Sequence, residues 1–329
     1  MVTRQPPLCI EGETPPAEFH YERHHCHDSV FLAHVPNASV VGPTGLVMTD
    51  SSEPIEQSLL LGRLNTDAVC SKFRLTDPEV LFGHYYTITS QWSAGYAHWL
   101  FDALPRLHAL DLIPNQDVRI VVPETLTALQ RDSLQALGIN PSRCLPLNHR
   151  HLKFQCLYVP SFMGTTGNPH PLGIAWLRKR FLGNDILVEG TERIYISRRS
   201  ASRRRVLNEK ELEPILLKHG FRIVECEKLS FPEQVELFSH ASMVVGLHGA
   251  GLANLLFAPA GCRVLEILTP PLRQRLMYYS IAGLLAQPYS YLDASVDESH
   301  SNSHGDDGFA DAIVYPAALD HALSLIVRE

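Results

Sequence analysis

The chain has 329 residues, of which 45% are hydrophobic and 19% are charged, and its formal net charge is −7. This composition excludes a disordered or collagen-like chain, and the length suggests about two domains. The acidic balance argues against a general affinity for nucleic acid or for anionic membranes. The seven cysteines are scattered without a CxxC pair, which is typical of reduced thiols rather than of a disulfide framework.

The N-terminal sequence MVTRQPP lacks the apolar stretch of a signal peptide. No run approaches the ~18 apolar residues that would cross a membrane. We therefore expect a cytoplasmic protein without a transmembrane segment.

The N-terminal half predicts mixed structure. The first 60 residues, with many Pro, Gly, Asn and Asp, predict turns and small strands. A helix is expected over 98–110, with a kink or break at Pro105. The other expected elements are strands at 84–91, 118–122 and 152–159 and a helix at 125–137. Residues 161–171, rich in Gly, Pro, Ser and Thr, are the best candidate for a linker.

The C-terminal half alternates more regularly between strand and helix. Asn208 with Glu211, and Ser230 with Glu233, predict two helix starts with capping boxes. The expected strands are 194–197, 221–224, 242–246 and 263–267, and the expected helices include 251–257, 272–285 and a last one from Pro316. Strands separated by helices predict parallel pairing with right-handed crossovers, hence a doubly wound sheet.

We predict an α/β protein with an N-terminal domain at 1–165, a C-terminal domain at 166–310 and a terminal strand or helix at 311–329. Residues 295–308 are polar and predict a loose loop.

The strongest local motif is a glycine turn at 243–254, MVVGLHGAGLAN. An apolar strand leads into it and a helix should follow, so free backbone N–H groups would suit a phosphate or pyrophosphate. Gly249 and Gly251 would let an anion approach the backbone, and His248 could add a donor or a positive charge. The spacing fits neither the dinucleotide nor the P-loop fingerprint. A tight turn whose glycines serve only packing is the alternative.

A basic run, SRRSASRRRVLN at 197–208, follows a predicted strand. Its five arginines are Arg198, Arg199, Arg203, Arg204 and Arg205. Ligands of open α/β sheets bind at the carboxyl ends of the strands, where the glycine turn should also lie. Guanidinium groups match phosphate oxygens well. A solvated loop and a nucleic-acid patch are the alternatives.

Two further features involve carboxylates. Glu266 lies near the end of an apolar strand, where it could accept hydrogen bonds from ribose hydroxyls or simply face solvent. His98 and Asp102 are four residues apart, so on a helix they share one face. Such a pair can provide a general base, although it is more often only a structural pair.

The sequence favours no metal site. The run HHCH at 24–27 and the pair His149 and His151 lack the spacing of zinc ligands. The acidic pairs 297–298 and 306–307 lie in the polar loop. There is no GxSxG and no HExxH motif.

Three stretches together resemble glycosyltransferase family 61. They are GYAHWLFDALPRL at 95–107, YISRRSASRRRVLNE at 195–209 and VVGLHGAGLANLLFAPAGCRVLEI at 244–267. Their order and separation also match, so the resemblance covers about residues 45 to 325. The chain is similar to the bacterial branch, which is associated with capsule, exopolysaccharide or lipopolysaccharide assembly.

The resemblance implies a GT-B-like fold, two Rossmann-like domains facing a cleft, and an inverting transfer from a nucleotide sugar, with UDP favoured, to a glycan or glycolipid. It implies no cofactor and no metal. The donor site would include Glu266 and the residues that match the family's motifs: Arg198, Arg204, Asn208, His248, Gly249, Ala250, Gly251 and Asn254. His98 and Asp102 match the acceptor side, and we expect Asp102 as the base with His98 orienting or contacting the acceptor.

Two other functions are open from the sequence. The first is a non-catalytic scaffold that binds a nucleotide or a glycan and keeps the fold. The second, a nicotinamide-dependent oxidoreductase, is disfavoured because the glycine spacing fails. Donor hydrolysis by the purified protein separates an enzyme from a scaffold.

Overall fold

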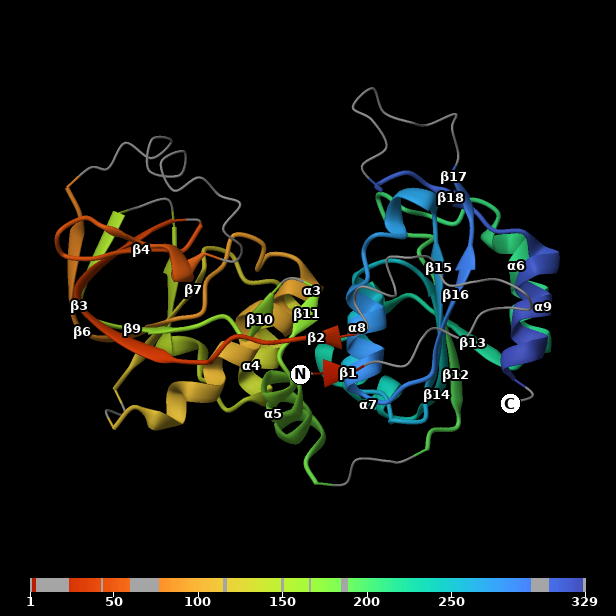
Figure 1. Ribbon diagram of the computed structural model, residues 1–329, viewed down its shortest axis with the longest axis horizontal. Helices are drawn as coiled ribbons and strands as arrows, with labels where there is room; N and C mark the ends of the chain where they lie inside the picture. The colour runs from red at the N-terminus through yellow and green to blue at the C-terminus, as the bar shows by residue number, and fades with distance from the viewer. Residues whose placement is uncertain are drawn as a thin grey trace. The chain divides into compact units, whose positions relative to one another are not determined.

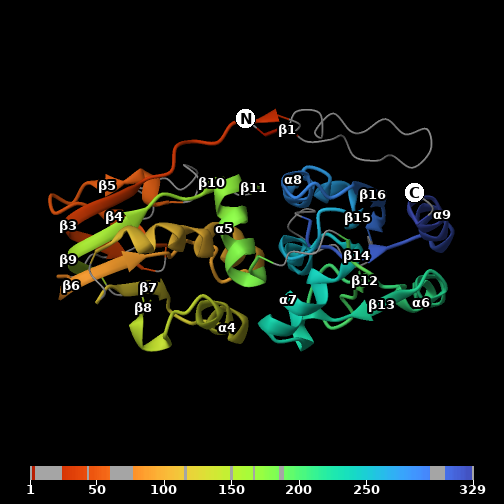
Figure 2. The same ribbon diagram turned by 90° about the horizontal axis from the view of Figure 1, so that it is seen from below.

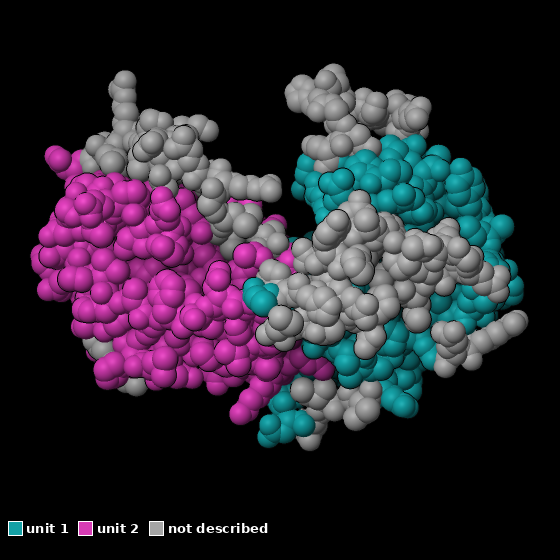
Figure 3. Space-filling view, viewed as in Figure 1, with its two compact units in different colours: residues 1–26, 182–329 teal, residues 27–181 magenta. Residues whose placement is uncertain are grey.

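The computed structural model divides the chain into two compact units (Figure 3). The N-terminal unit comprises His27–Phe181, and the C-terminal unit comprises Leu182–Glu329 together with Met1–Cys26. The structure describes residues 2–3, 24–42, 44–59, 77–114, 117–148, 151–165, 167–184, 189–296 and 308–327. No helix in these ranges is long and apolar enough to cross a membrane.

The division near residue 181 falls later than the expected boundary at 165. The reason is the helix α5 (Pro171–Leu182), whose Gly173 packs closely against Pro105 and Met163 of the N-terminal unit. The expected linker contains a small hairpin instead, in which β10 (Gly164–Thr165) pairs with β11 (Asn168–Pro169). The last helix, α9 (Pro316–Ile326), forms part of the core of the C-terminal unit.

The N-terminal unit is built on a mixed seven-stranded sheet, in the order β5-β4-β3-β9-β6-β7-β8 (Figure 1). The strands β6, β7, β8 and β9 run parallel, whereas β3, β4 and β5 pair antiparallel. Their bounds are β3 Leu32–Val41, β4 Leu46–Met48, β5 Pro54–Ile55, β6 Glu79–Thr87, β7 Arg119–Pro123, β8 Cys144–Leu147 and β9 His151–Pro160. The antiparallel part departs from a fully Rossmann-like domain, because the short connections between β3, β4 and β5 allow only antiparallel pairing.

A continuous helical segment, 96–112, crosses this unit and changes geometry twice. It begins as α3 (Tyr96–His98), widens into the π-helical η2 (Trp99–Ala103) and tightens into the 3-10 helix η3 (Leu104–Leu112). The predicted break at Pro105 is confirmed as the second change, because proline has no N–H for the helical hydrogen bond. The remaining helices of the unit are η1 (Glu56–Ser58), α4 (Ala128–Ala136) and η4 (Pro141–Arg143).

The C-terminal unit contains a five-stranded, all-parallel sheet in the order β13-β12-β14-β15-β16. The strands are β12 Glu192–Ile196, β13 Phe221–Val224, β14 Ala241–Leu247, β15 Arg263–Leu268 and β16 Tyr289–Asp293. The predicted doubly wound parallel sheet is thus confirmed. Chain order reverses between β12 and β14, which is where open α/β sheets bind ligands.

Helices cover both faces of this sheet (Figure 2). One face packs against α6 (Glu209–Lys218) and α9 through a core that includes Leu212, Leu216 and Leu323. The other side carries α7 (Phe231–Ser239), η6 (Ala250–Leu256) and α8 (Met277–Leu284). The shorter elements are β1 Val2–Thr3, β2 His24–His25, η5 Cys226–Lys228, η7 Pro270–Leu272, β17 Ser295–Val296 and β18 Ala312–Ile313.

The two predicted capping boxes have different outcomes. Ser230 and Glu233 form theirs at the start of α7. Asn208 occupies the N-cap position of α6, but its side chain makes no capping bond. Its amide instead donates to the Val314 carbonyl at 2.7 Å and accepts from the Val314 N–H at 3.1 Å. The predicted capping box of Asn208 and Glu211 is therefore wrong, because a residue distant in sequence competes for the Asn208 side chain.

Candidate donor and acceptor sites

The basic run and the glycine turn meet at one edge of the C-terminal sheet. The run follows β12, the glycine turn follows β14, and the two strands are parallel neighbours. A direct contact joins them, because Arg204 Nη1 donates to the His248 carbonyl at 3.2 Å. The expected juxtaposition at the switch point of the sheet is confirmed.

The Arg198 guanidinium is held by the backbone of its own loop. Its Nε donates to the Arg204 carbonyl at 2.6 Å and its Nη2 to the Arg203 carbonyl at 2.9 Å. No carboxylate of the described residues forms an ion pair with it. Burial lowers the pKa of Arg198 from its usual value, so its cationic form lacks full hydration.

Arg204 combines backbone strain with an uncompensated charge. Its φ of 52° lies in the left-handed region, which costs a residue with a side chain about 1–2 kcal/mol. Burial, reinforced by the nearby Arg198, lowers its pKa to about 10. Its Nε is buried without a hydrogen-bond partner among the described residues. A cation in this state stabilises any anion that replaces the lost water.

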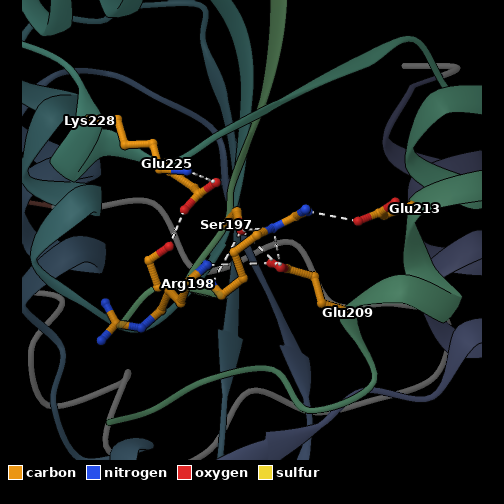
Figure 4. A network of polar contacts seen from close by, with 8 residues as sticks. Ser197, Arg198, Glu209, Glu213, Glu225 and Lys228 are labelled. Carbon is orange, nitrogen blue, oxygen red and sulfur yellow. Dashed lines mark hydrogen bonds and ion pairs between the residues drawn. The ribbon is translucent and has the colours of Figure 1, made fainter. Parts of the chain in front are cut away.

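The other arginines of the run divide into paired and unpaired ones. Arg199 bonds Glu209 at 3.2 Å and Glu213 at 2.7 Å, and Figure 4 shows the surrounding polar network. Arg205 bonds Asp311 at 2.5 Å. Arg203 packs over the Phe309 ring at 4.3 Å, with no ion pair found within the described residues. Arg198, Arg203 and Arg204 are therefore the candidates for binding an anion.

The glycines of the turn have separate roles. A Cβ at Gly249 would lie 2.3 Å from Nη1 of Arg198, so this glycine makes room for the guanidinium. A Cβ at Gly251 would lie 2.9 Å from Cγ2 of Ile196, so this glycine serves packing against β12. The expected helix is the seven-residue 3-10 helix η6, which begins at the exposed Ala250. Such a short helix has a small dipole, so the positive potential comes mainly from the arginines.

His248 is fixed by a buried chain of hydrogen bonds. Its Nδ1 lies 2.5 Å from Oε1 of Glu266, and Oε2 of Glu266 accepts from the Tyr289 hydroxyl at 2.6 Å. Glu266 is fully buried. Burial of Tyr278 and Tyr289, reinforced by the nearby Glu266 carboxylate, raises the pKa of both phenols. Because both carboxylate oxygens have protein donors, the position of Glu266 fits orientation of His248 rather than the expected contact with ribose.

Two asparagines expected at the donor site have protein partners. Asn254 is fully buried, and its amide donates to Oε1 of Gln234 at 2.7 Å. Asn208 bonds Val314, as described above. Both side chains therefore hold neighbouring segments together at the positions where the structure places them.

In the N-terminal unit, the predicted pair His98 and Asp102 is confirmed as a contact. Nδ1 of His98 lies 2.7 Å from Oδ2 of Asp102. The Asp102 side chain is 6% exposed and that of His98 is 28% exposed, so the imidazole is the member that reaches solvent. Burial raises the pKa of Asp102, while His98 and Arg106 act to lower it.

Arg106 anchors the helical segment below this pair. It is buried, and its Nη1 and Nη2 donate to the carbonyls of Thr89 at 2.8 Å and Pro160 at 2.9 Å. Its pKa falls to about 10 because of burial. The Tyr86 hydroxyl donates to the Arg106 carbonyl, so β6 and η3 are joined one helical turn after Asp102.

Within the described residues, no group of three or more His, Cys, Asp and Glu side chains could hold a metal ion. His149 and the acidic pairs 297–298 and 306–307 lie outside the described residues, as do the side chains of His24 and His25.

Several residues at these sites were not singled out from the sequence. They are Trp92, Glu209, Arg275, Tyr278, Tyr289, Phe309 and Asp311. The stretch RQRLMYY at 273–279, basic and aromatic a few residues after a strand, is the signal that could have indicated Arg275 and Tyr278.

Comparison with known proteins identifies the family to which the chain belongs. The model of the family described as "Glycosyltransferase 61" matches residues 96–265, which is more than half of the chain and includes His98, Asp102, the five arginines of the basic run and the glycine turn. The chain belongs to glycosyltransferase family 61. The resemblance expected from the three motifs is confirmed, and membership supports the expected enzyme class, a glycosyltransferase.

Curated relatives match shorter stretches. An "EGF domain-specific O-linked N-acetylglucosamine transferase" of Drosophila melanogaster is 38% identical over 76 residues, 22% of this chain and 14% of that protein. A "Protein O-linked-mannose beta-1,4-N-acetylglucosaminyltransferase 2" of Takifugu rubripes is 34% identical over 121 residues, 35% of this chain and 20% of that protein. The chain thus spans no more than a fifth of the length of either relative.

Proposed function

We propose that this family 61 protein transfers a sugar from a nucleotide sugar to a hydroxyl of a glycan, with inversion at the anomeric carbon. The C-terminal unit would bind the diphosphate of the donor, and the N-terminal unit would activate the acceptor. The observation that carries the proposal is the pair Arg198 and Arg204, partly buried and without carboxylate partners among the described residues. Such a pair fits a diphosphate leaving group, whose negative charge grows in the transition state.

The donor chemistry follows from that charge. As the bond between the anomeric carbon and the phosphate oxygen breaks, the nucleoside diphosphate leaves with an additional negative charge. Fixed guanidinium groups stabilise this charge without reorganisation, which supports a transfer that needs no metal ion. His248, oriented by Glu266, would contribute a further donor.

The acceptor chemistry follows from the exposure of the His98 and Asp102 side chains. With Nδ1 bonded to Asp102, the Nε2 of a neutral His98 can take the proton of the acceptor hydroxyl while its oxygen attacks the anomeric carbon. This reverses the roles expected from the sequence, since Asp102 is buried behind the imidazole. Asp102 would orient His98 and stabilise its cationic form.

The proposal extends to the donor, the acceptor and the location of the protein. We propose a UDP-sugar as donor, a glycan or glycolipid of capsular, exopolysaccharide or lipopolysaccharide assembly as acceptor, and a cytoplasmic location. The names of the two relatives concern N-acetylglucosamine, which makes UDP-N-acetylglucosamine the first donor to test.

The deciding experiment is a calorimetric titration of UDP into wild type, Arg204→Ala and Arg199→Ala. Arg204→Ala loses a charge-assisted hydrogen bond to the diphosphate, so this variant should bind UDP about 10- to 100-fold more weakly than wild type. Arg199→Ala removes an equal charge from the same loop, but one already paired with Glu209 and Glu213, and should change little. Equal affinity in all three proteins contradicts the donor site. UDP binding without any release of UDP from UDP-sugars favours the non-catalytic scaffold.

A further inference from the structure

Trp92 differs from the other two tryptophans of the chain in its surroundings. Trp99 is fully buried and its indole N–H donates to the Ser133 hydroxyl at 2.8 Å. Trp176 lies partly buried on α5, against the guanidinium of Arg180. Trp92 is 38% exposed, and no hydrogen bond from its N–H is found among the residues that the structure describes. Part of the Trp92 indole is therefore open to solvent and can contact a ligand.

The exposed indole lies directly beside the candidate base. The ring centroids of Trp92 and His98 are 5.3 Å apart and the rings are tilted by 41°. Trp92 therefore borders the same patch as the part of His98 that reaches solvent. A molecule whose hydroxyl approaches the imidazole would come close to the indole as well.

The turn that carries Trp92 is firmly held. Ser93 is buried, and its hydroxyl donates to the Ser90 carbonyl at 2.6 Å. Nε2 of Gln130, from α4, donates to the Ser93 carbonyl at 2.6 Å. The Gly95 N–H donates to the Trp92 carbonyl at 2.9 Å. Since the backbone on both sides of Trp92 is fixed, the indole is presented at a defined place against His98 of α3.

We infer that Trp92 is a binding residue for the acceptor, on which the apolar face of a pyranose ring stacks. The electron-rich face of an indole attracts the weakly positive C–H groups of a sugar, and its free N–H can donate to a sugar oxygen. This combination favours a sugar acceptor over the hydroxyl of a serine or threonine side chain, which offers no such face. The inference rests on the proposed function, because it names the acceptor of that reaction.

The test measures binding without requiring transfer. Methyl β-pyranosides of glucose, galactose and N-acetylglucosamine, methyl α-mannopyranoside and a threonine-containing peptide are titrated by NMR into wild type and variants. Loss of stacking in Trp92→Ala should weaken pyranoside binding about tenfold. Trp176→Ala removes a tryptophan that contacts His108 and Arg180 instead of His98, and it serves as the matched control. Trp92→Phe keeps a ring, so a smaller loss than in Trp92→Ala supports stacking even if the alanine variant is less stable.

A second arm separates direct contact from an effect through His98. The same substitution is made in His98→Ala, where positioning of the imidazole no longer matters. A further loss of pyranoside binding in that background supports direct contact, and no further loss overturns it. Equal binding by wild type and Trp92→Ala, or binding of the peptide alone, also overturns the inference.

The two proposals fail in distinguishable ways. Release of UDP from a UDP-sugar depends on the arginines of the C-terminal unit. A protein that releases UDP but binds pyranosides equally well with and without Trp92 refutes the acceptor residue and keeps the proposed function. A protein that binds pyranosides through Trp92 but never binds UDP refutes the proposed function and keeps the sugar contact.

Discussion

In the C-terminal unit, Arg198 and Arg204 have no carboxylate partners among the described residues, whereas in the N-terminal unit Asp102 is paired with His98 at 2.7 Å. The first arrangement leaves positive charge available to a ligand. The second holds a carboxylate and an imidazole in a fixed contact that can accept and stabilise a proton. Under the proposed function, charge binding and proton transfer would therefore lie in separate units, and each could be altered without the other.

The largest expected effect tests this separation at the proton-transfer site. His98→Ala should lower kcat about 10²- to 10⁴-fold, the usual contribution of a general base, with unchanged affinity for UDP. If Asp102 only orients the imidazole, Asp102→Asn should retain more activity than His98→Ala; the opposite order makes Asp102 the base. Near-wild-type kcat in both variants would place the base elsewhere. Steady-state kinetics and UDP calorimetry on both variants provide the measurements.

The pH dependence of stability provides the fold control for Asp102→Asn. Burial raises the pKa of Asp102 above its usual 3.8, so the folded chain keeps this proton to a higher pH than the unfolded chain does. The protonated form therefore favours folding at low pH, and this contribution disappears as the pH rises through the folded-state pKa. Asn cannot lose a proton, so Asp102→Asn should gain in melting temperature relative to wild type as the pH rises toward neutral.

A smaller effect is expected from a pair of glycine substitutions within the glycine turn. Gly249→Ala places a Cβ against the Arg198 guanidinium, so UDP binding should weaken about tenfold as that charge is displaced. Gly251→Ala places its Cβ against Ile196, and this overpacking should cost about 1–3 kcal/mol of stability. The comparison needs only UDP calorimetry and denaturant unfolding of the two proteins. If UDP binding weakens in Gly251→Ala but not in Gly249→Ala, the anion binds at the Gly251 end of the turn and not beside Arg198.

The smallest expected effect concerns metal ions. Since arginines would balance the charge of the leaving diphosphate, EDTA should leave the transfer rate within about twofold of the untreated enzyme. The assay compares the rate before and after chelation, and then after addition of Mn²⁺ or Mg²⁺. A rate that EDTA abolishes and a divalent cation restores contradicts metal-independent transfer.

The sequence was most informative where local pattern and topology coincide. Because β12 and β14 are parallel and adjacent, the segments that follow them had to meet, and the bond from Arg204 to the His248 carbonyl confirms it. The contact between His98 and Asp102 could be predicted for a similar reason, since helical residues four apart share a face.

The rest depends on contacts between distant segments. Arg205 is paired by Asp311, 106 residues away, so no local pattern could indicate that Arg205 is neutralised while Arg204 is not. The burial of Glu266 behind His248 and Tyr289 likewise depends on the neighbouring strand β16. The exposure of Trp92 could not be predicted from its residue type, because tryptophan is on average highly buried.

The π-helical turn η2, Trp99–Ala103, has a consequence for how this chain can vary in length. A π-turn contains one residue more than an α-helical path of the same rise, and each residue rotates a helix by about 100°. Deleting one residue from η2 would therefore turn it into an ordinary α-helical path of the same rise, and Arg106 would keep its place near the carbonyls of Thr89 and Pro160. An inserted residue has no such turn to absorb it and would rotate Arg106 by about 100° relative to His98. The segment between His98 and Arg106 can therefore lose one residue more readily than it can gain one.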